Sequence, residues 1–311
     1  MKIVSVMNYK GGVGKTSLAT NLAGQLAWLG RKVLVLDLDP QTSLTFSLIK
    51  ADVWEKLFSP ARTIKTWFES FESDAPLSLD SLVYTPQRVK AALNGRGQLD
   101  MISSHLGLIN VDLELATKLG GANLAQAKKN FIKIHRRLAD GLGNDSLLKA
   151  REYDLVLIDC PPNFNIVTKT AIVASDYILV PTRPDYLSTL GIDYLIRSVN
   201  QLVKDYNDYA AVEGGGLVAK ISPKVLGVVF TMIQEYDGVP IGSQRPFMDR
   251  VQRMPDLSVF QSYIKRNDTL FAAAPESGIP VVLNGYSSGS HQSVVDGLEA
   301  VTAEFAKAIG I

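Results

Sequence analysis

The feature that most constrains the fold is a glycine-rich loop near the N-terminus, MNYKGGVGKTS at residues 7–17. A short β-branched run, Ile3–Met7, precedes it, and the segment Ser17–Leu29 that follows has leucines at helical spacing. Gly30 is placed to end that helix, and the apolar run Val33–Leu38 comes next. The order predicts a β-loop-α-β unit in which the loop leads into a helix N-terminus, the arrangement that binds phosphate.

The loop ends as a P-loop does, in Gly14-Lys15-Thr16, but its beginning departs from the pattern. Tyr9 stands where the opening glycine would be, and an additional lysine, Lys10, precedes the first glycines. The glycines let backbone N–H groups converge on phosphate oxygens, Lys15 would contact the β- and γ-phosphates, and the Thr16 hydroxyl would join a Mg²⁺ shell. We expect nucleotide binding by Gly11, Gly12, Val13, Gly14, Lys15, Thr16 and Ser17.

Further apolar runs alternate with helical patterns along the chain, which predicts an α/β fold. The helical patterns include Leu190–Tyr206 and Gln292–Ile309. We expect a mostly parallel, twisted sheet with helices on both faces, in a single P-loop ATPase domain over residues 1–311. The segment Asp52–Gln98 is irregular and acidic, and is interpreted as an insertion of helices and loops. The later strands are predicted at Leu99–Ile102, Leu155–Ile158, Tyr177–Val180, Val225–Phe230 and Val281–Leu283.

Composition excludes several classes of protein. The formal net charge is +1, so any affinity for nucleic acid must come from a local patch. Cys160 is the single cysteine, which excludes a disulfide framework or a cysteine-rich metal cage within one chain. No apolar run is long enough for a membrane span, and the N-terminus lacks a signal-peptide pattern. We expect a cytoplasmic protein that does not bind membranes.

Carboxylates follow two of the predicted strands. Asp159 ends an apolar strand in YDLVLIDCPP, and Asp37 and Asp39 follow the strand in VLVLDLDPQTS. In open α/β sheets ligands bind at the carboxyl ends of the strands. Together with the P-loop, Asp159 is interpreted as the Walker B carboxylate, and Asp37 or Asp39 is expected near the γ-phosphate.

At this point the sequence resembles a known family. The motifs KGGVGKTS, LDLDPQTS and LVLIDCPP, in that order, are similar to those of the ParA/Soj branch of the deviant Walker A ATPases, which also includes MinD. The resemblance continues through LDMISS, PTRPDYLSTLGIDYL, LGVVFTMI and IKRNDTLFAAAPESGIPVV, which a polar YSSGSHQS loop follows. It covers nearly the whole chain apart from Asp52–Gln98.

This resemblance implies a role for each lysine of the loop and for the carboxylates. Lys10 would reach across an ATP-dependent homodimer to the partner subunit's ATP, while Lys15 would serve its own ATP. Asp39 would position the hydrolytic water, and Mg²⁺ would be bound by Thr16, Asp39 and Asp159. It also implies a weak ATPase that a ParB-like adaptor protein stimulates.

The resemblance also implies non-specific binding to double-stranded DNA and association with the nucleoid. Candidate DNA contacts lie in one basic stretch, at Arg245, Arg250, Arg253, Lys265 and Arg266. A second candidate for DNA contacts is a basic stretch predicted as one helix, which carries Lys128, Lys129, Lys133, Arg136 and Arg137. The chain departs from the family where Gln234-Glu235-Tyr236 replaces an Asp-x-Arg pattern. The chain begins at its P-loop strand, so we do not expect site-specific operator binding.

Two other functions remain open alongside partition or positioning of DNA or other cargo. A MinD-like or orphan nucleotide switch would position a protein complex without DNA, although the C-terminal GLEAVTAEFAKAIGI lacks the basic face of a membrane-binding helix. A metabolic ATP-dependent enzyme would need a small-substrate site, yet His105, His135 and His291 are scattered. Iron–sulfur relatives need cysteines that this chain lacks. The role of the Asp52–Gln98 insertion is a hypothesis only, namely an adaptor-binding surface.

Overall fold

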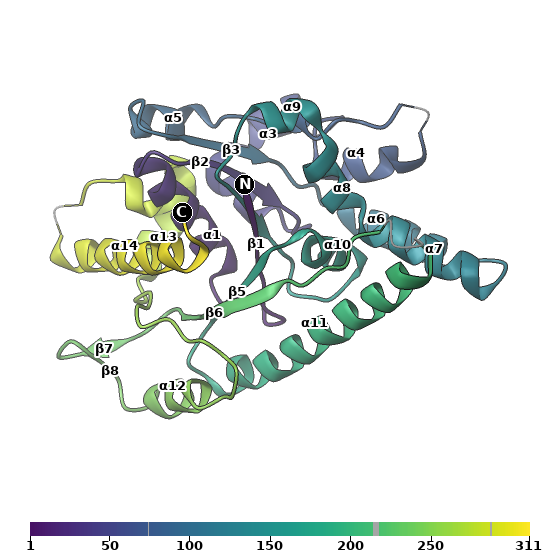
Figure 1. Ribbon diagram of the computed structural model, residues 1–311. Coiled ribbons are helices and arrows are strands. Elements are labelled where there is room, and N and C mark those ends of the chain that lie inside the picture. Colours follow the sequence, from purple (N-terminus) through teal and green to yellow (C-terminus); the bar gives the residue numbers. More distant parts are fainter. Residues whose placement is uncertain (74, 214–217, 287) are drawn as a thin grey trace.

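A six-stranded parallel sheet forms the centre of the molecule (Figure 1). The computed structural model describes residues 1–73, 75–213, 218–286 and 288–311. The strand order is β3-β2-β4-β1-β5-β6, and every pairing within the sheet is parallel. The predicted α/β fold is therefore confirmed. The strands are β1 (Lys2–Val6), β2 (Lys32–Asp37), β3 (Gln98–Ile102), β4 (Leu155–Asp159), β5 (Tyr177–Thr182) and β6 (Lys224–Phe230).

Helices cover both faces of this sheet, because its strands are apolar on both sides. Along β2, Val33 and Val35 pack in one core cluster, whereas Leu34 and Leu36 pack in the other. The first cluster lies against α1 (Lys15–Trp28), α2 (Ser43–Leu48), α5 (Gln87–Leu93), α13 (Asp268–Ser277) and α14 (Gly289–Ile309). The second lies against α4 (Ile64–Glu69), α6 (Leu108–Lys118), α7 (Leu124–His135), α8 (Arg137–Asn144), α9 (Ser146–Ala150), α10 (Ile166–Ala174), α11 (Tyr186–Glu213) and α12 (Arg245–Gln252).

The irregular segment between β2 and β3 lies beside the edge strand β3 (Figure 1). Its described part consists of short helices and loops, and residue 74 lies outside the described residues. Asp100 on β3 is fully buried and accepts a hydrogen bond from the Thr85 hydroxyl (2.5 Å), which fixes this segment to the sheet. It also accepts from the hydroxyl of Tyr153, just before β4 (2.5 Å). Its remaining elements are α3 (Ala51–Leu57), η1 (Ser70–Glu72) and η2 (Asp80–Leu82).

One strand prediction is wrong. Val281–Leu283 forms a 3-10 helix, η3, and not a strand. Val281 and Val282 are buried against α1, and the Val282 N–H donates to Asn21 Oδ1 at 3.1 Å. A short apolar run indicates that a segment is buried, but it does not by itself distinguish a strand from another buried segment.

A small hairpin completes the fold. An antiparallel hairpin, β7 (Glu235–Tyr236) and β8 (Val239–Pro240), projects beyond the sheet next to α12 (Figure 1). Ser287, in the predicted polar loop before α14, lies outside the described residues. Among the residues that are described, none of the helices combines the length and the apolar character that a membrane crossing requires.

Candidate nucleotide site

The glycine-rich loop connects the end of β1 to α1 in a conformation that requires its glycines. Gly12 and Gly14 have φ angles of +70° and +78°, in the left-handed region where other residues are strained. The loop is tied to the ends of β5 and β6. Asn8 Nδ2 donates to the Pro181 carbonyl at 2.8 Å, and the Thr231 hydroxyl donates to the Val13 carbonyl at 2.8 Å. The backbone is thus held open before any ligand arrives.

Lys15 lies inside this loop. Its side chain is buried, and Nζ is 3.3 Å from both the Asn8 and the Lys10 carbonyl oxygens. Burial lowers the pKa of Lys15, while Asp159 and Asp39 oppose that change. Phosphate oxygens would satisfy a buried ammonium group better than two carbonyl groups at this distance.

Asp159 is buried at the end of β4 and has one oxygen free. Its Oδ2 accepts a 2.6 Å hydrogen bond from the Thr16 hydroxyl, whereas Oδ1 has no hydrogen-bond partner within the described part of the chain. Burial raises the pKa of Asp159 to about 8, and the nearby Asp37 carboxylate adds to the effect. A free carboxylate oxygen beside a hydroxyl is a donor set that suits Mg²⁺, which prefers oxygen ligands and keeps water and phosphate in its shell.

Asp37 and Asp39 differ in what their carboxylates do. Asp37 is fully buried, opposite Asp159 in the sheet register, and accepts from the Thr45 N–H (2.8 Å) and hydroxyl (2.7 Å). Burial raises the pKa of Asp37 to about 7. Asp39 lines the cavity beside the loop, and among the described residues its Oδ1 accepts a hydrogen bond from the Gln41 N–H alone, at 2.9 Å. Asp39 is therefore the more available of the two for a water or metal ligand.

The cavity above the loop has a volume of about 460 Å³. Opposite the loop it has an apolar wall, from the segment after β6 and from α13 and the turn that follows it. Asn21 on α1 holds this wall in place through its bond to the Val282 N–H. An apolar wall beside a phosphate loop suits a nucleobase. The motifs LGVVFTMI and IKRNDTLFAAAPESGIPVV do not by themselves predict contact with a nucleobase, so the sequence does not identify this wall. Its apolar residues are Met232, Phe271, Ala274, Pro275, Ile279 and Pro280.

The structure separates the predicted site residues into two groups. Val13 and Asp159 are buried behind the cavity lining, and Lys10 lies outside it. Lys10 Nζ is instead 2.8 Å from Asp185 Oδ1, at the start of α11. The predicted residues that line the cavity are Gly11, Gly12, Gly14, Lys15, Thr16, Ser17 and Asp39.

An exposed apolar surface borders Lys10. On α11, Leu187 and Tyr194 are 65% exposed and Leu190 is 44% exposed. The Tyr194 ring packs against Tyr9 of the glycine-rich loop, with a centroid separation of 5.1 Å. Apolar side chains this exposed and this close together are typical of a protein interface.

The predicted DNA-contact residues cluster around the β7–β8 hairpin. Arg245 Nε donates to the Pro240 carbonyl on β8 at 2.7 Å, and Lys265 pairs with Glu235 on β7 at 2.7 Å. Arg250 and Arg253 are exposed on α12 and at its end. Arg266 is exposed and pairs with Asp268 at 2.6 Å. The residues thus share one region of the surface, although two of them already have carboxylate partners.

The second basic stretch is not the single helix that was predicted. It divides into α7 and α8, with Arg136 between them. Arg137 is buried against Trp67 and Phe71, since an apolar environment lies on that face of α8. Only part of the stretch therefore faces solvent.

Comparisons with known proteins agree with this geometry. A family model described as an AAA domain matches residues 1–212. The sporulation initiation inhibitor protein Soj of Bacillus subtilis is 26% identical over 304 residues, covering 97% of this chain and 98% of Soj. The chromosome partitioning protein ParA of Caulobacter vibrioides is 28% identical over 285 residues, covering 91% of this chain and 87% of that protein.

Among solved structures, a variant of Cyanothece McdA in complex with ATP has the same fold. Its TM-score is 0.69 at 21% identity, with 100% of this chain and 97% of that chain covered. The family match spans well over half of the sequence and includes the phosphate loop, Asp39 and Asp159. The chain belongs to the ParA/MinD-type family of P-loop ATPases.

Proposed function

We propose that this protein is a ParA-like ATPase that dimerises on ATP, binds DNA without sequence preference, and partitions or positions DNA or other cargo. Soj and ParA, whose names describe sporulation control and chromosome partitioning, support this reading through similarity along nearly the whole chain. In this role the ATP-bound dimer would lie on the nucleoid. A ParB-like adaptor on the cargo would trigger hydrolysis and release.

The observation that carries the proposal is the position of Lys10. Lys15 lines the nucleotide cavity of its own subunit, whereas Lys10 does not. Lys10 is held at the surface by Asp185 and lies beside the exposed apolar residues of α11. Two ATP molecules facing each other concentrate negative charge, so cations from both subunits are needed at the interface. A second copy docked on the α11 surface would bring its Lys10 to this subunit's ATP.

Hydrolysis would use the carboxylates on the sheet edge. Thr16 and Asp159 would hold Mg²⁺, with Asp39 next to the γ-phosphate to orient the attacking water. Mg²⁺ would neutralise charge that develops on the phosphate oxygens. A partner would complete the stabilisation of the transition state, because the subunit alone supplies only part of the positive charge.

DNA binding would use the basic surface around the hairpin. Arg245, Arg250 and Arg253 are exposed there and form no ion pair among the described residues. Contacts of this kind go to phosphates and carry no sequence information. A dimer would present two such surfaces, which makes the affinity steeply dependent on salt.

The test is binding of the Asp39→Ala protein to random-sequence duplex DNA, with ATP and with ADP, at two salt concentrations. The proposal predicts binding with ATP only, weakened by salt, and indifferent to sequence. Removal of the charges at Arg250 and Arg253 should weaken DNA binding. Removal of the charges at Lys56 and Lys90, two exposed lysines elsewhere, should leave DNA binding unchanged. A good ATP dimer without DNA binding would contradict the DNA part of the proposal.

One observation favours a second candidate, a nucleotide switch that positions a protein complex without DNA. Lys265 and Arg266 are already paired with Glu235 and Asp268. These pairs reduce the positive potential available to phosphates. The same experiment separates the two candidates, since both require the ATP dimer and only one requires DNA.

A further inference from the structure

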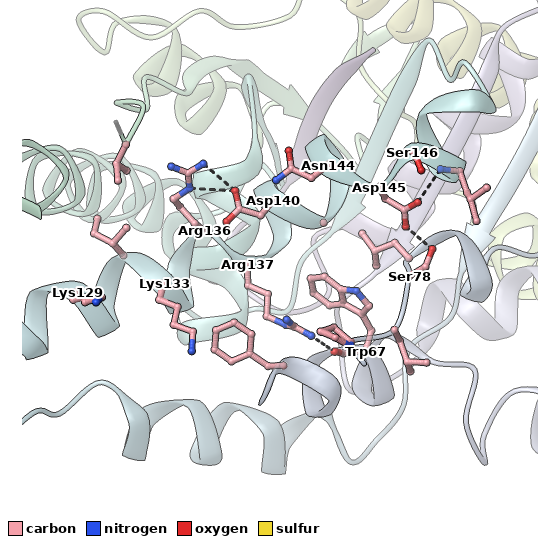
Figure 2. Close-up of a pocket in the computed structure, with 18 residues that line it drawn as sticks. Trp67, Ser78, Lys129, Lys133, Arg136, Arg137, Asp140, Asn144, Asp145 and Ser146 are labelled. Atoms are coloured by element: carbon pink, nitrogen blue, oxygen red, sulfur yellow. Dashed lines mark hydrogen bonds and ion pairs between the residues drawn. The ribbon is translucent and has the colours of Figure 1, made fainter. Parts of the chain in front are cut away.

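A second cavity lies apart from the nucleotide site, between α7–α8 and the segment from α4 to η2 (Figure 2). Its volume is about 830 Å³, within the range of ligand-binding cavities. The residues to which the proposed function gives nucleotide, metal or DNA contacts do not line it, whereas Lys129, Lys133, Arg136 and Arg137 of the second basic stretch do. The proposed function therefore leaves this cavity without a role.

One side of the cavity is cationic. Lys129 and Lys133 are exposed on α7, four residues apart, and Arg137 follows on the same side at the start of α8. Lys133 Nζ lies 4.8 Å from the centroid of the Phe71 ring. Neither lysine takes part in any of the ion pairs found in residues 1–73, 75–213, 218–286 and 288–311.

Arg137 is a buried cation that forms no ion pair with a carboxylate of the described residues. It is 8% exposed, and its guanidinium carbon lies 4.1 Å from the Trp67 ring centroid and 4.4 Å from that of Phe71. It donates to the Trp67 carbonyl, as Figure 2 shows. Its Nε is buried with no hydrogen-bond partner in the described part of the chain. A buried charge of this kind is stabilised when an anion approaches.

The carboxylates of the cavity are already engaged. Asp140 pairs with Arg136 at 2.9 Å. Asp145 accepts from the Ser78 hydroxyl at 2.5 Å and caps α9 through the Leu147 and Leu148 N–H groups. Neither neutralises Lys129, Lys133 or Arg137, so the lining presents a net positive charge to a ligand.

The rest of the lining is apolar and partly open to solvent. Leu77, Ile132 and Val218 contribute apolar surface, and Leu147 at the opening is 61% exposed. A concave surface that combines exposed leucine with cations does not suit a DNA backbone, which offers phosphates without apolar groups. It does suit a protein segment with both acidic and aliphatic side chains.

We propose that this cavity binds an acidic, aliphatic peptide segment of a partner protein. Its carboxylates would contact Lys129 and Lys133, and its aliphatic side chains would contact Leu77, Ile132 and Leu147. Side chains four residues apart on a helix are separated by about 5–6 Å. Alternate residues of an extended peptide are separated by about 6.6 Å, so an acidic-x-acidic pattern matches the two lysines. The inference does not depend on whether the partner stimulates hydrolysis.

The test measures fluorescence anisotropy of a labelled peptide with a Glu-Leu-Glu-Val core between Gly-Ser flanks. Analogues carry Gln or Lys in place of both Glu residues. The wild-type protein should bind the Glu peptide, and bind both analogues at least about tenfold more weakly. The double variant Lys129→Glu/Lys133→Glu should no longer bind the Glu peptide, and it should bind the Lys analogue more tightly than the Glu peptide. Leu147→Ser, at an exposed position, should weaken binding without reversing the charge preference.

The matched control is Lys56→Glu/Lys90→Glu, which makes the same charge change on exposed lysines outside the cavity. It should bind the Glu peptide as the wild type does. The proposal is overturned if the Glu peptide binds no better than its Gln analogue, or if both double variants weaken binding equally. Full displacement of the peptide by an equal concentration of inorganic phosphate would also overturn it, by showing a small-anion site. Nucleotide is absent throughout, so the result is independent of the proposed ATP dimer.

Discussion

Lys10 Nζ and Asp185 Oδ1 form an ion pair at 2.8 Å, which fixes the additional lysine of the phosphate loop to the start of α11. Asp185 also accepts the Ser188 N–H at 2.9 Å and lies 3.5 Å from Arg183 Nε. The pair holds Lys10 at the surface, whereas Lys15 is buried in the loop. Of the two lysines in this short motif, Lys15 therefore lies in the phosphate loop and Lys10 lies at the surface beside α11.

Removal of the charge at Asp185 should strengthen the ATP dimer. Both side chains of the pair are about one third exposed, at 32% and 34%, so the pair contributes about 0–1 kcal/mol after solvent screening. Asp185→Asn retains an acceptor for the Ser188 N–H and frees Lys10 for the partner subunit. We expect dimerisation with ATP to strengthen by up to about fivefold in sedimentation experiments. Asp193→Asn, an exposed position on the same helix, is the control, and a weaker dimer in Asp185→Asn alone would argue against this competition.

Loss of the Asp39 carboxylate should stop hydrolysis but leave ATP binding and folding intact. Asp39 contributes one turn hydrogen bond, to the Gln41 N–H, so Asp39→Ala should cost about 1 kcal/mol of stability or less. Hydrolysis should fall by about 10²-fold or more, because the attacking water loses its orienting group. Nucleotide turnover and size measurements with ATP and Mg²⁺ check this. Asp39→Asn keeps the turn and should be equally inactive, so an active Asn variant would restrict the role of Asp39 to structure.

The nucleotide-free protein should lose stability as pH rises toward 8. Burial raises the pKa of Asp37 to about 7 and of Asp159 to about 8, above the values of an unfolded chain. The native state therefore binds more protons than the unfolded state, and the free energy of unfolding falls as pH rises through this window. Tm should be lower at about pH 8 than at about pH 6, and this difference should be smaller in Asp159→Asn than in the wild type.

Binding of Mg²⁺ with ATP should reverse the loss of stability at higher pH, because the metal favours the ionised carboxylate. Calorimetry in two buffers of different ionisation enthalpy should then detect proton release on Mg²⁺ binding. If Tm depends on pH equally in Asp159→Asn and in the wild type, and no proton is released on Mg²⁺ binding, then Asp159 is ionised without the metal.

Gly24 on α1 should resist substitution even though it lies within a helix. A Cβ there would be 2.9 Å from Pro280 Cβ and 3.3 Å from Val282 Cγ2. Alanine improves helix propensity by about 1 kcal/mol, but the crowding against a rigid proline costs about 1–3 kcal/mol. Gly24→Ala should lower Tm and weaken ATP binding, because Pro280 lines the nucleotide cavity. Gly191→Ala on α11, with open space around it, should raise Tm, and an equal rise in both would contradict the crowding.

The sequence predicts the sheet and the phosphate loop because both are local. Buried strands such as Leu155–Ile158 have short apolar runs, and the loop has a fixed spacing of glycine, lysine and threonine. The position of Asp159 at the ligand-binding edge could be predicted because a carboxylate that ends a buried strand lies there, whereas its role as a Mg²⁺ ligand stays a prediction. Each of these inferences needs only neighbouring residues.

Features that depend on distant contacts could not be predicted in the same way. The Lys10–Asp185 pair joins residues 175 positions apart. Val281–Leu283 has the composition of a strand, but packing against α1 makes it a 3-10 helix. Arg137 belongs to a charged run in the sequence, yet it is buried between Trp67 and Phe71, which an unrelated segment supplies.

The role of Lys10 across the dimer is tested by mixing two variants, Lys10→Ala and Asp39→Ala, each of which should be inactive alone. If Lys10 acts on the partner subunit's ATP, a mixed dimer has one complete site, with Lys15 and Asp39 from the Lys10→Ala subunit and Lys10 from the other. We expect mixing to restore ATP hydrolysis, which neither variant should show alone. Co-purification through a tag on one variant establishes that mixed dimers form. If mixed dimers form and remain inactive, Lys10 acts only within its own subunit and the proposed role across the dimer is wrong.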